Sequence, residues 1–184
     1  MNQEVFLTVR INDKCEPIDR GDMYEDPLHD ALEEKKLGEV TGGGSQLNEN
    51  YNVEYCELEV CLTGNLEEAK KVIIETLEKV GLPKGSKILL EKEEIPIGNH
   101  DVMAVHFDNL SLPNSVYEEN DINDVLEEIE NLLGDKGRRN SHRSGKEETI
   151  VYYGGISFET MKDAVSEFIT NHPLCQNGGI TQDA

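Results

Sequence analysis

The sequence contains no tryptophan and no hydrophobic run long enough to span a bilayer. The first residues, Met1-Asn2-Gln3-Glu4, lack the basic region and the hydrophobic stretch of a signal peptide. The four cysteines form no Cys-x-x-Cys pair and show no spacing to paired histidines. We therefore expect a cytoplasmic protein that has reduced thiols and no contact with a membrane.

Basic residues are also scarce. The chain has 17 Lys and Arg against 38 Asp and Glu, which gives a net charge of −21 over 184 residues. The acidity extends over both halves and is not confined to a tail. Such a field repels nucleic acid and anionic membranes, and it speeds the encounter with a basic protein. The charge predicts no nucleic-acid partner; it favours either a basic protein partner or solubility alone.

Catalytic and metal-binding signatures are missing as well. The histidines show neither His-x-His nor His-Glu-x-x-His spacing, so we predict no metal ion and no cofactor. His106 and Asp108 lie two apart at the end of a predicted strand and could share a face. Cys56 is expected in the core, whereas Cys61 is expected to point outward without a visible base. An enzyme that uses one of these groups is therefore the least favoured alternative.

The glycine-rich stretch Thr41–Ser45 could offer backbone N–H groups to a phosphate. However, no Lys-Ser/Thr pair follows it, and no helix is predicted to begin there, as a phosphate-binding loop requires. Glycine in such a place more often permits a bulge or close packing of the backbone. We therefore favour a structural role for this stretch.

What the sequence does contain is an internal repeat, in which residues 28–90 recur in degenerate form as residues 122–181. In the last helix of each copy, a constant offset pairs Ala69 with Met161, Val72 with Ala164, Ile73 with Val165 and Leu77 with Ile169. Two copies indicate two similar supersecondary units, because a solenoid needs at least three repeats.

Hydrophobic periodicity and capping residues predict six elements in the first copy. They are a strand at 4–11, a helix from Asp26 to Gly38, strands at 39–47 and 53–62, a helix from Asn65 to Gly81 and a strand at 86–92. Residues 12–25 are expected to form a loop, and residues 91–101 a link to the second copy. The order β-α-β-β-α-β is that of the ferredoxin-like fold.

The second copy predicts the same order less clearly. Its elements are a strand at 102–107, a helix from Asp121, strands at 137–141 and 149–153, a helix from Ser157 and a strand at 178–181, with a loop at 108–120. We therefore predict an α+β protein, a tandem duplication of a ferredoxin-like unit with helices on one face of each antiparallel sheet. The units span residues 1–95 and 96–184, as two domains or as one compact domain.

Two surfaces carry acidic groups in this scheme. The open sheet face of the first unit should show Phe6, Thr8, Arg10, Tyr55, Glu57 and Glu59, and an acidic band at the start of the third helix comprises Glu118, Glu119, Asp121, Asp124, Glu127, Glu128 and Glu130. A basic cluster follows the band and contains Lys136, Arg138, Arg139, His142, Arg143 and Lys146. No aromatic residues alternate with it, so we interpret this cluster as a balance to the acidic band.

The stretches LGEVTGGGSQL, EYCELEVCL and LPKGSKILLE resemble a group of small acidic bacterial proteins, several of which act as immunity proteins for contact-dependent or polymorphic toxins. The resemblance implies no catalytic residue. With the charge, it suggests an inhibitor that binds a basic toxin, by expectation a nuclease. The predicted partner-binding residues are Tyr55, Glu57, Glu59, Glu118, Glu119, Asp121, Asp124, Glu127 and Glu128. The alternative is a regulatory module that binds a small ligand, with the 42–44 turn facing it.

Overall fold

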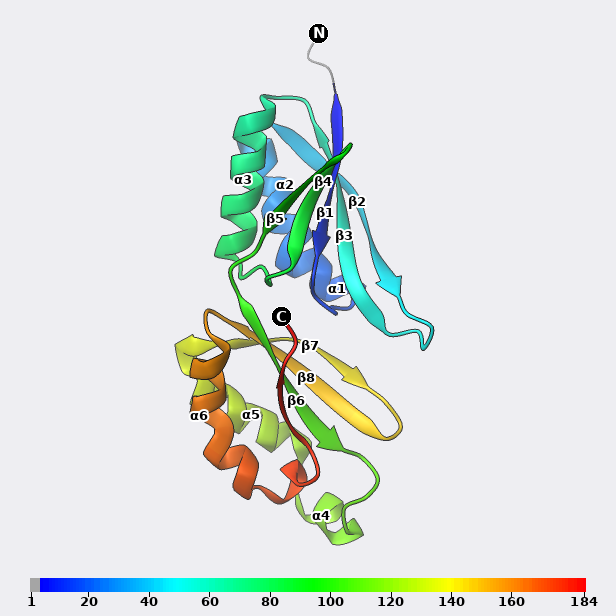
Figure 1. Ribbon diagram of the computed structural model, residues 1–184, viewed down its shortest axis with the longest axis vertical. Coiled ribbons are helices and arrows are strands. Elements are labelled where there is room, and N and C mark those ends of the chain that lie inside the picture. The colour runs from blue at the N-terminus through cyan, green and yellow to red at the C-terminus, as the bar shows by residue number, and fades with distance from the viewer. Residues whose placement is uncertain (1–3) are drawn as a thin grey trace. The chain divides into compact units, whose positions relative to one another are not determined.

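The computed structural model describes residues 4–184, and the chain divides into two compact units, Met1–His100 and Asp101–Ala184. Each unit is an antiparallel sheet with helices packed on one face (Figure 1). Among the described residues, no helix is long and apolar enough to cross a membrane.

The first unit is built on a five-stranded sheet in the order β2-β3-β1-β4-β5. The strands are β1 Val5–Ile11, β2 Gly38–Leu47, β3 Val53–Leu62, β4 Ser86–Leu90 and β5 Glu93–Ile97; the two main helices are α2 Asp26–Glu34 and α3 Leu66–Lys79. Without β5, this connectivity and strand order are those of the ferredoxin-like fold. The core lies between the sheet and the helices, where Cys56, Leu58, Val60 and Leu62 of β3 are buried as their alternation predicts.

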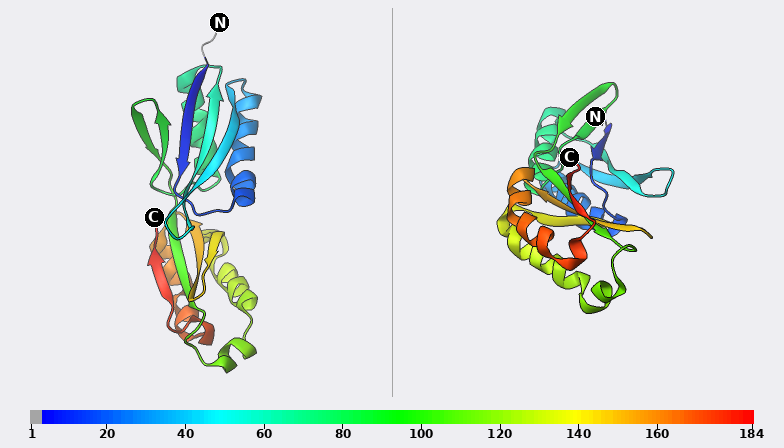
Figure 2. Two further views of the ribbon diagram at one scale, coloured as in Figure 1. Left: turned by 90° about the vertical axis from the view of Figure 1, so that its right-hand side faces the viewer. Right: turned by 60° about the horizontal axis from the view of Figure 1, so that its bottom comes forward.

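The second unit repeats this topology with a four-stranded sheet in the order β7-β8-β6-β9. Its elements are β6 Asp101–Asp108, α4 Asn114–Glu119, α5 Ile122–Leu133, β7 Arg138–Ser144, β8 Glu148–Gly155, α6 Phe158–Asn171 and β9 Gly179–Gln182, with short 3₁₀ turns η2 Gly134–Lys136 and η3 Pro173–Cys175. Helices α5 and α6 cover the same face of the sheet (Figure 2). The predicted fold class, two βαββαβ units in tandem, is therefore confirmed.

The aligned helices of the repeat correspond in the structure. Both α3 and α6 are 14 residues long, and each begins at a side-chain cap. Asn65 accepts a hydrogen bond from the Glu68 N–H, and Ser157 accepts one from the Thr160 N–H. Three of the four aligned pairs are buried in both copies: Ala69 with Met161, Ile73 with Val165 and Leu77 with Ile169.

The loop predicted at residues 12–25 is wrong in its second half. Helix α1, Pro17–Arg20, begins there and continues through a π-helical turn, η1 Gly21–Glu25, into α2. Asp26 therefore lies inside a helical run and is not its cap. Proline at the first helical position, here Pro17, sets a helical φ for the start of the run. The chain leaves the helix at Lys36, whose φ of 56° is left-handed, and Gly38 already belongs to β2.

The link predicted at residues 91–101 is also wrong, because it contains β5 and the start of β6. Strand β5 was missed in the sequence because charged residues obscure its pattern, in which only Ile95 and Ile97 pack toward the core. Pro96 is tolerated because β5 is an edge strand that needs hydrogen bonds on one side only. The boundary between the two units lies between residues 100 and 101. The sequence predicted it between residues 95 and 96. The loop predicted at 108–120 contains α4.

Candidate functional site

The second unit has an open pocket of about 920 Å³ on the helix-bearing side of its sheet. Its lining comes from β6, β7, β8, the α4–α5 segment and η3, and it contains both apolar and polar side chains. We call its apolar residues Phe107, Val151, Leu126 and Leu174 the floor, because all but Leu126 are buried. The lining also includes Tyr117, Asn120, Ile122, Asn123, Ser144 and Thr149. A pocket of this size lies within the range of small-molecule and side-chain binding sites.

The acidic side of the pocket follows from how α5 begins. Asn120 is extended, and the Asp121 carboxylate caps the helix by accepting a 2.8 Å hydrogen bond from the Asn123 N–H. This break between α4 and α5 brings the end of one helix next to the start of the other. The acids at both ends, Glu118, Glu119, Asp121 and Asp124, therefore line the same pocket.

The charge around the pocket is predominantly negative. Its lining contains five carboxylates, the fifth being Asp108, against Arg139 and His142 as the basic residues. Arg139 is partly neutralised, because its Nε lies 3.1 Å from Oε1 of Glu130. The N–H groups of Ser111 and Leu110 each donate a 2.8 Å hydrogen bond to Asp108, which lowers the pKa of its carboxyl and keeps it ionised. The pocket is therefore suited to a cation with an apolar stem.

The acidic band predicted from the sequence divides in the structure. Its first four members, Glu118, Glu119, Asp121 and Asp124, lie at this pocket. Glu127 is exposed but outside the lining, and Glu128 lies at a separate hollow of about 450 Å³ with Leu132, Phe168 and His172. Glu130 faces Arg139, which fits the predicted balance between the band and the basic cluster at that pair.

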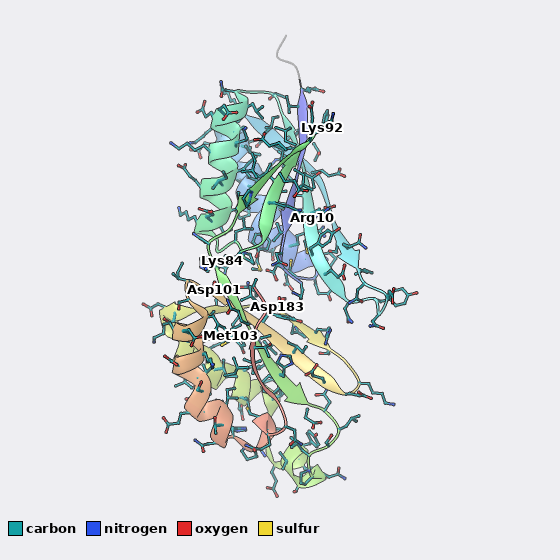
Figure 3. The ribbon with its side chains drawn as sticks, in the orientation of Figure 1. Arg10, Lys84, Lys92, Asp101, Met103 and Asp183 are labelled. Atoms are coloured by element: carbon teal, nitrogen blue, oxygen red, sulfur yellow. The ribbon has the colours of Figure 1, made fainter. Side chains whose placement is uncertain are left out.

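The open face of the first unit is less acidic than its sequence implies. Arg10, labelled on β1 in Figure 3, forms a 2.8 Å ion pair with Glu57 and places its guanidinium carbon 4.2 Å from the Tyr55 ring centroid. Tyr55 and Glu57 are thus engaged within the face. Glu59 is exposed and lines a shallow hollow of about 470 Å³ beside Phe6. Of the predicted trio, Glu59 is the most accessible to a partner.

The structure does not bring His106 and Asp108 together as a reactive pair. His106 Nδ1 lies 2.8 Å from Oε1 of Glu148, and its Nε2 lies 2.8 Å from Oγ1 of Thr181. Asp108, at the end of β6, instead binds backbone N–H groups of the following loop. Within residues 4–184, no group of three or more His, Cys, Asp or Glu side chains could hold a metal ion.

All four cysteines are free and buried. As predicted, Cys61 points away from the core, onto the open face opposite Phe6, but only 7% of it is exposed. Burial raises the pKa of Cys61, and burial raises that of Cys175 to about 11. No pattern in the sequence indicates that Cys15 and Cys56 meet, because the path of the chain after β1 depends on tertiary contacts. Their sulfur atoms are 3.3 Å apart.

The glycine stretch Thr41–Ser45 lies in β2 and precedes no helix. The register shifts between Val40 and Gly42, which marks a bulge at Thr41. Gly43 packs closely: a Cβ there would lie 2.7 Å from Oε1 of Glu25 and 3.0 Å from the carbonyl oxygen of Glu57. Both observations agree with the structural role favoured for this stretch.

Neither a protein-family model nor a curated protein sequence matches the chain. Solved structures that are similar include a complex of TiaS with a tRNA, AMPCPP and agmatine, at 10% identity and a TM-score of 0.34, over 88% of this chain and 56% of that one. A putative monooxygenase from Lactobacillus acidophilus matches at 12% identity and a TM-score of 0.31, over 98% and 94% of the two chains. The regulatory subunit of aspartate kinase from Thermus thermophilus matches at 10% identity and a TM-score of 0.28, over 89% and 92%. The chain thus spans little more than half of the TiaS chain.

Proposed function

We propose that this protein is an inhibitor of the immunity type, which binds a basic protein toxin and receives one of its Lys or Arg side chains in the pocket of the second unit. The observation that carries the proposal is the combination of an apolar floor with five carboxylates around it. A long basic side chain has the same two parts, an apolar stem and a charged head.

In this proposal the two parts of the pocket have different tasks. The stem would lie on Phe107, Val151 and Leu126, and the head would face the carboxylates of the α4–α5 segment. Removing the stem from water supplies affinity, whereas the carboxylates select a cation and fix its position. Neutral or acidic side chains would leave the acids without a counter-charge, which costs affinity.

The rest of the surface supports the same class of partner. A net charge of −21 accelerates the approach of a positively charged protein at low salt. A nuclease is a suitable toxin, because its cleft must carry basic groups that bind phosphates. Inhibition then needs no chemistry from this chain: the bound protein covers the cleft and excludes the substrate. The resemblance of residues 26–91 to acidic immunity proteins agrees with this mechanism.

The test first isolates a partner that this protein retains from an extract of the source organism. The affinity of the purified partner for variants of this protein is then measured. The test compares Glu118→Gln/Glu119→Gln with Glu127→Gln/Glu128→Gln. Both variants lose two negative charges from consecutive positions of the acidic band, but the first pair lines the pocket and the second does not. We expect the first variant to weaken binding about tenfold or more, and the second to change it little.

The binding isotherm should be recorded at low and high salt, together with the partner's toxicity when the two proteins are co-expressed. Equal losses in both variants would mean that net charge alone drives binding and would contradict a role for the pocket. A partner that is not basic, or whose activity persists in the complex, would contradict the inhibitor function.

The volume of the pocket also fits the alternative function, a regulatory module that binds a small ligand, because about 920 Å³ would accommodate a metabolite. The acidic lining would then favour a small cation such as an amine. A thermal-shift screen of amines against the same two variants separates the two functions. A stabilisation that Glu118→Gln/Glu119→Gln abolishes, without any protein partner, would favour the regulatory module.

A further inference from the structure

Two cysteines that are far apart in the sequence meet inside the first unit. Cys15 lies between β1 and α1, and Cys56 lies in β3, 41 positions later. Their sulfur atoms are 3.3 Å apart, and both side chains are fully buried. A disulfide has its sulfur atoms about 2.05 Å apart, so bond formation requires the two atoms to approach by only about 1.3 Å.

The surroundings of the pair are polar, unlike those of cysteines that only fill a core. Oγ of Ser45 lies 3.7 Å from Sγ of Cys56, and Nη1 of Arg20 donates a 3.2 Å hydrogen bond to that hydroxyl. Sγ of Cys56 also lies 3.5 Å from the carbonyl oxygens of Asp13 and Cys15. The hydroxyl of Ser45 thus connects the sulfur of Cys56 to the partly buried guanidinium group of Arg20.

The two thiols differ in acidity as a consequence. The hydrogen bond from Cys15 lowers the pKa of Cys56, and the Ser45 hydroxyl and the Arg20 charge act in the same direction, against the opposing effects of burial and of the Asp13 charge. The same hydrogen bond and burial raise the pKa of Cys15. Cys56 is therefore the better nucleophile, and Cys15 remains a protonated thiol beside it.

We propose that Cys15 and Cys56 form a redox-active dithiol, a modification site that a small hydroperoxide oxidises to a disulfide and that a thiol reductant restores. The sulfur of Cys56 attacks one oxygen of the hydroperoxide; the O–O bond breaks, and an alcohol or water leaves. The resulting sulfenic acid on Cys56 is attacked by the sulfur of Cys15; the S–S bond forms, the S–O bond breaks, and water leaves with the Cys15 proton. In sum, two thiols and one hydroperoxide give one disulfide, one alcohol or water molecule, and one water molecule.

The position of the pair predicts which oxidant reacts and what the bond does. Both thiols are buried, so an oxidant reaches them during local opening of the edge strand β2, where Ser45 lies opposite Cys56. Hydrogen peroxide should therefore react faster than a bulky aromatic disulfide. The new bond ties the chain before α1 to the sheet and closes a long loop, so the oxidised protein should unfold at a higher temperature.

The test treats the full-length protein with hydrogen peroxide, then blocks remaining thiols under denaturing conditions and maps the peptides by mass spectrometry. We expect one linked peptide pair that contains Cys15 and Cys56, the loss of two hydrogen atoms from the intact mass, and a thermal midpoint several degrees higher, all reversed by dithiothreitol. Cys61→Ala and Cys175→Ala are the controls and should form the same bond.

Two variants separate the steps. Cys15→Ala should stop at a sulfenic acid on Cys56 that dimedone traps, and Cys56→Ala should form neither this acid nor the disulfide. A purely structural role for the pair would not give a trapped sulfenic acid. If oxidation of the folded protein yields no Cys15–Cys56 peptide, or links Cys61 or Cys175 instead, the proposal is overturned. Peptide mapping of the oxidised parent protein, which carries no substitution, shows whether the Cys15–Cys56 bond forms even if a variant fails to fold.

Discussion

The hydroxyl of Tyr24 donates a 2.6 Å hydrogen bond to Oδ2 of Asp13, and both side chains are buried. Tyr24 comes from the π-helical turn η1, and Asp13 follows β1. The other oxygen of Asp13 accepts a 2.7 Å hydrogen bond from the Lys14 N–H. A buried carboxylate is stable only when it is hydrogen-bonded, so this contact joins the segment before α2 to the sheet.

We predict that Tyr24→Phe lowers the free energy of unfolding by about 2 kcal/mol, because it removes a hydrogen bond to a buried charged group. Urea denaturation of the reduced protein measures the change. Tyr51→Phe is the matched control: Tyr51 is 85% exposed, and its substitution should change stability by less than about 0.5 kcal/mol. Equal effects of the two substitutions would contradict the importance of the Tyr24–Asp13 contact.

We predict that Tyr153→Phe changes the free energy of unfolding in the opposite direction from Tyr24→Phe. The Tyr153 side chain is fully buried, and its hydroxyl has no hydrogen-bond partner among residues 4–184. Burial also raises the pKa of Tyr153, so its hydroxyl remains protonated. Removing an unsatisfied polar atom from a core avoids its desolvation cost, and we expect the free energy of unfolding to rise by about 1 kcal/mol. A loss of stability in urea denaturation would mean that the hydroxyl binds a partner, such as a buried water molecule.

The sequence predicted the fold because the helices and most strands carry strong local signals. The buried stripes of α3 and α6 follow helical periodicity, and Asn65 and Ser157 mark where they begin. The missed elements lack such signals. Strand β5 is short, charged and at an edge, and α1 begins without a side-chain cap. Their stability comes from tertiary contacts, which single-sequence periodicity does not report.

The candidate site was predictable only in part. The acids of the α4–α5 segment were visible as a band, but the pocket also needs Phe107, Val151 and Leu174, which come from three distant segments. The pairing of Arg10 with Glu57 could follow only from the register of β1 against β3, which places them opposite each other. Cys15 and Cys56 meet for a similar reason: Cys56 is opposite Ile11, and the chain returns past it to reach Cys15.

Asp108 should make stability depend on pH in the acid range. Hydrogen bonds from the Ser111 and Leu110 N–H groups lower its folded-state pKa below the ordinary value of 3.8. Its contribution is therefore fully present above that value and is lost as the pH falls through the lower folded-state pKa. We predict that Asp108→Asn is less stable than the parent protein at neutral pH, and that the difference shrinks below pH 3.8.

Thermal unfolding of both proteins across this range measures the difference. Asp124→Asn is a control at the same pocket, since within residues 4–184 no backbone N–H donates to the Asp124 side chain, and the residue is exposed. A gap between Asp108→Asn and the parent protein that stays constant down to about pH 3 would show that the substitution acts through packing and not through ionisation.

Two neighbouring glycines of β2 provide a matched test of the glycine-rich stretch. At Gly43 a Cβ would meet the carbonyl oxygen of Glu57 at 3.0 Å and the side chains of Glu25 and Arg20, whereas at Gly44 it would meet nothing within 4 Å. Gly43→Ala should lower the free energy of unfolding by about 1 kcal/mol or more, because the backbone of β3 must shift. Gly44→Ala should raise it by about 0.5 kcal/mol, because alanine loses less conformational entropy on folding. Urea denaturation of the two variants measures both changes. Equal losses of stability in the two variants would mean that the whole stretch needs glycine. If inorganic phosphate stabilised the parent protein but neither variant, the result would support a phosphate-binding role instead.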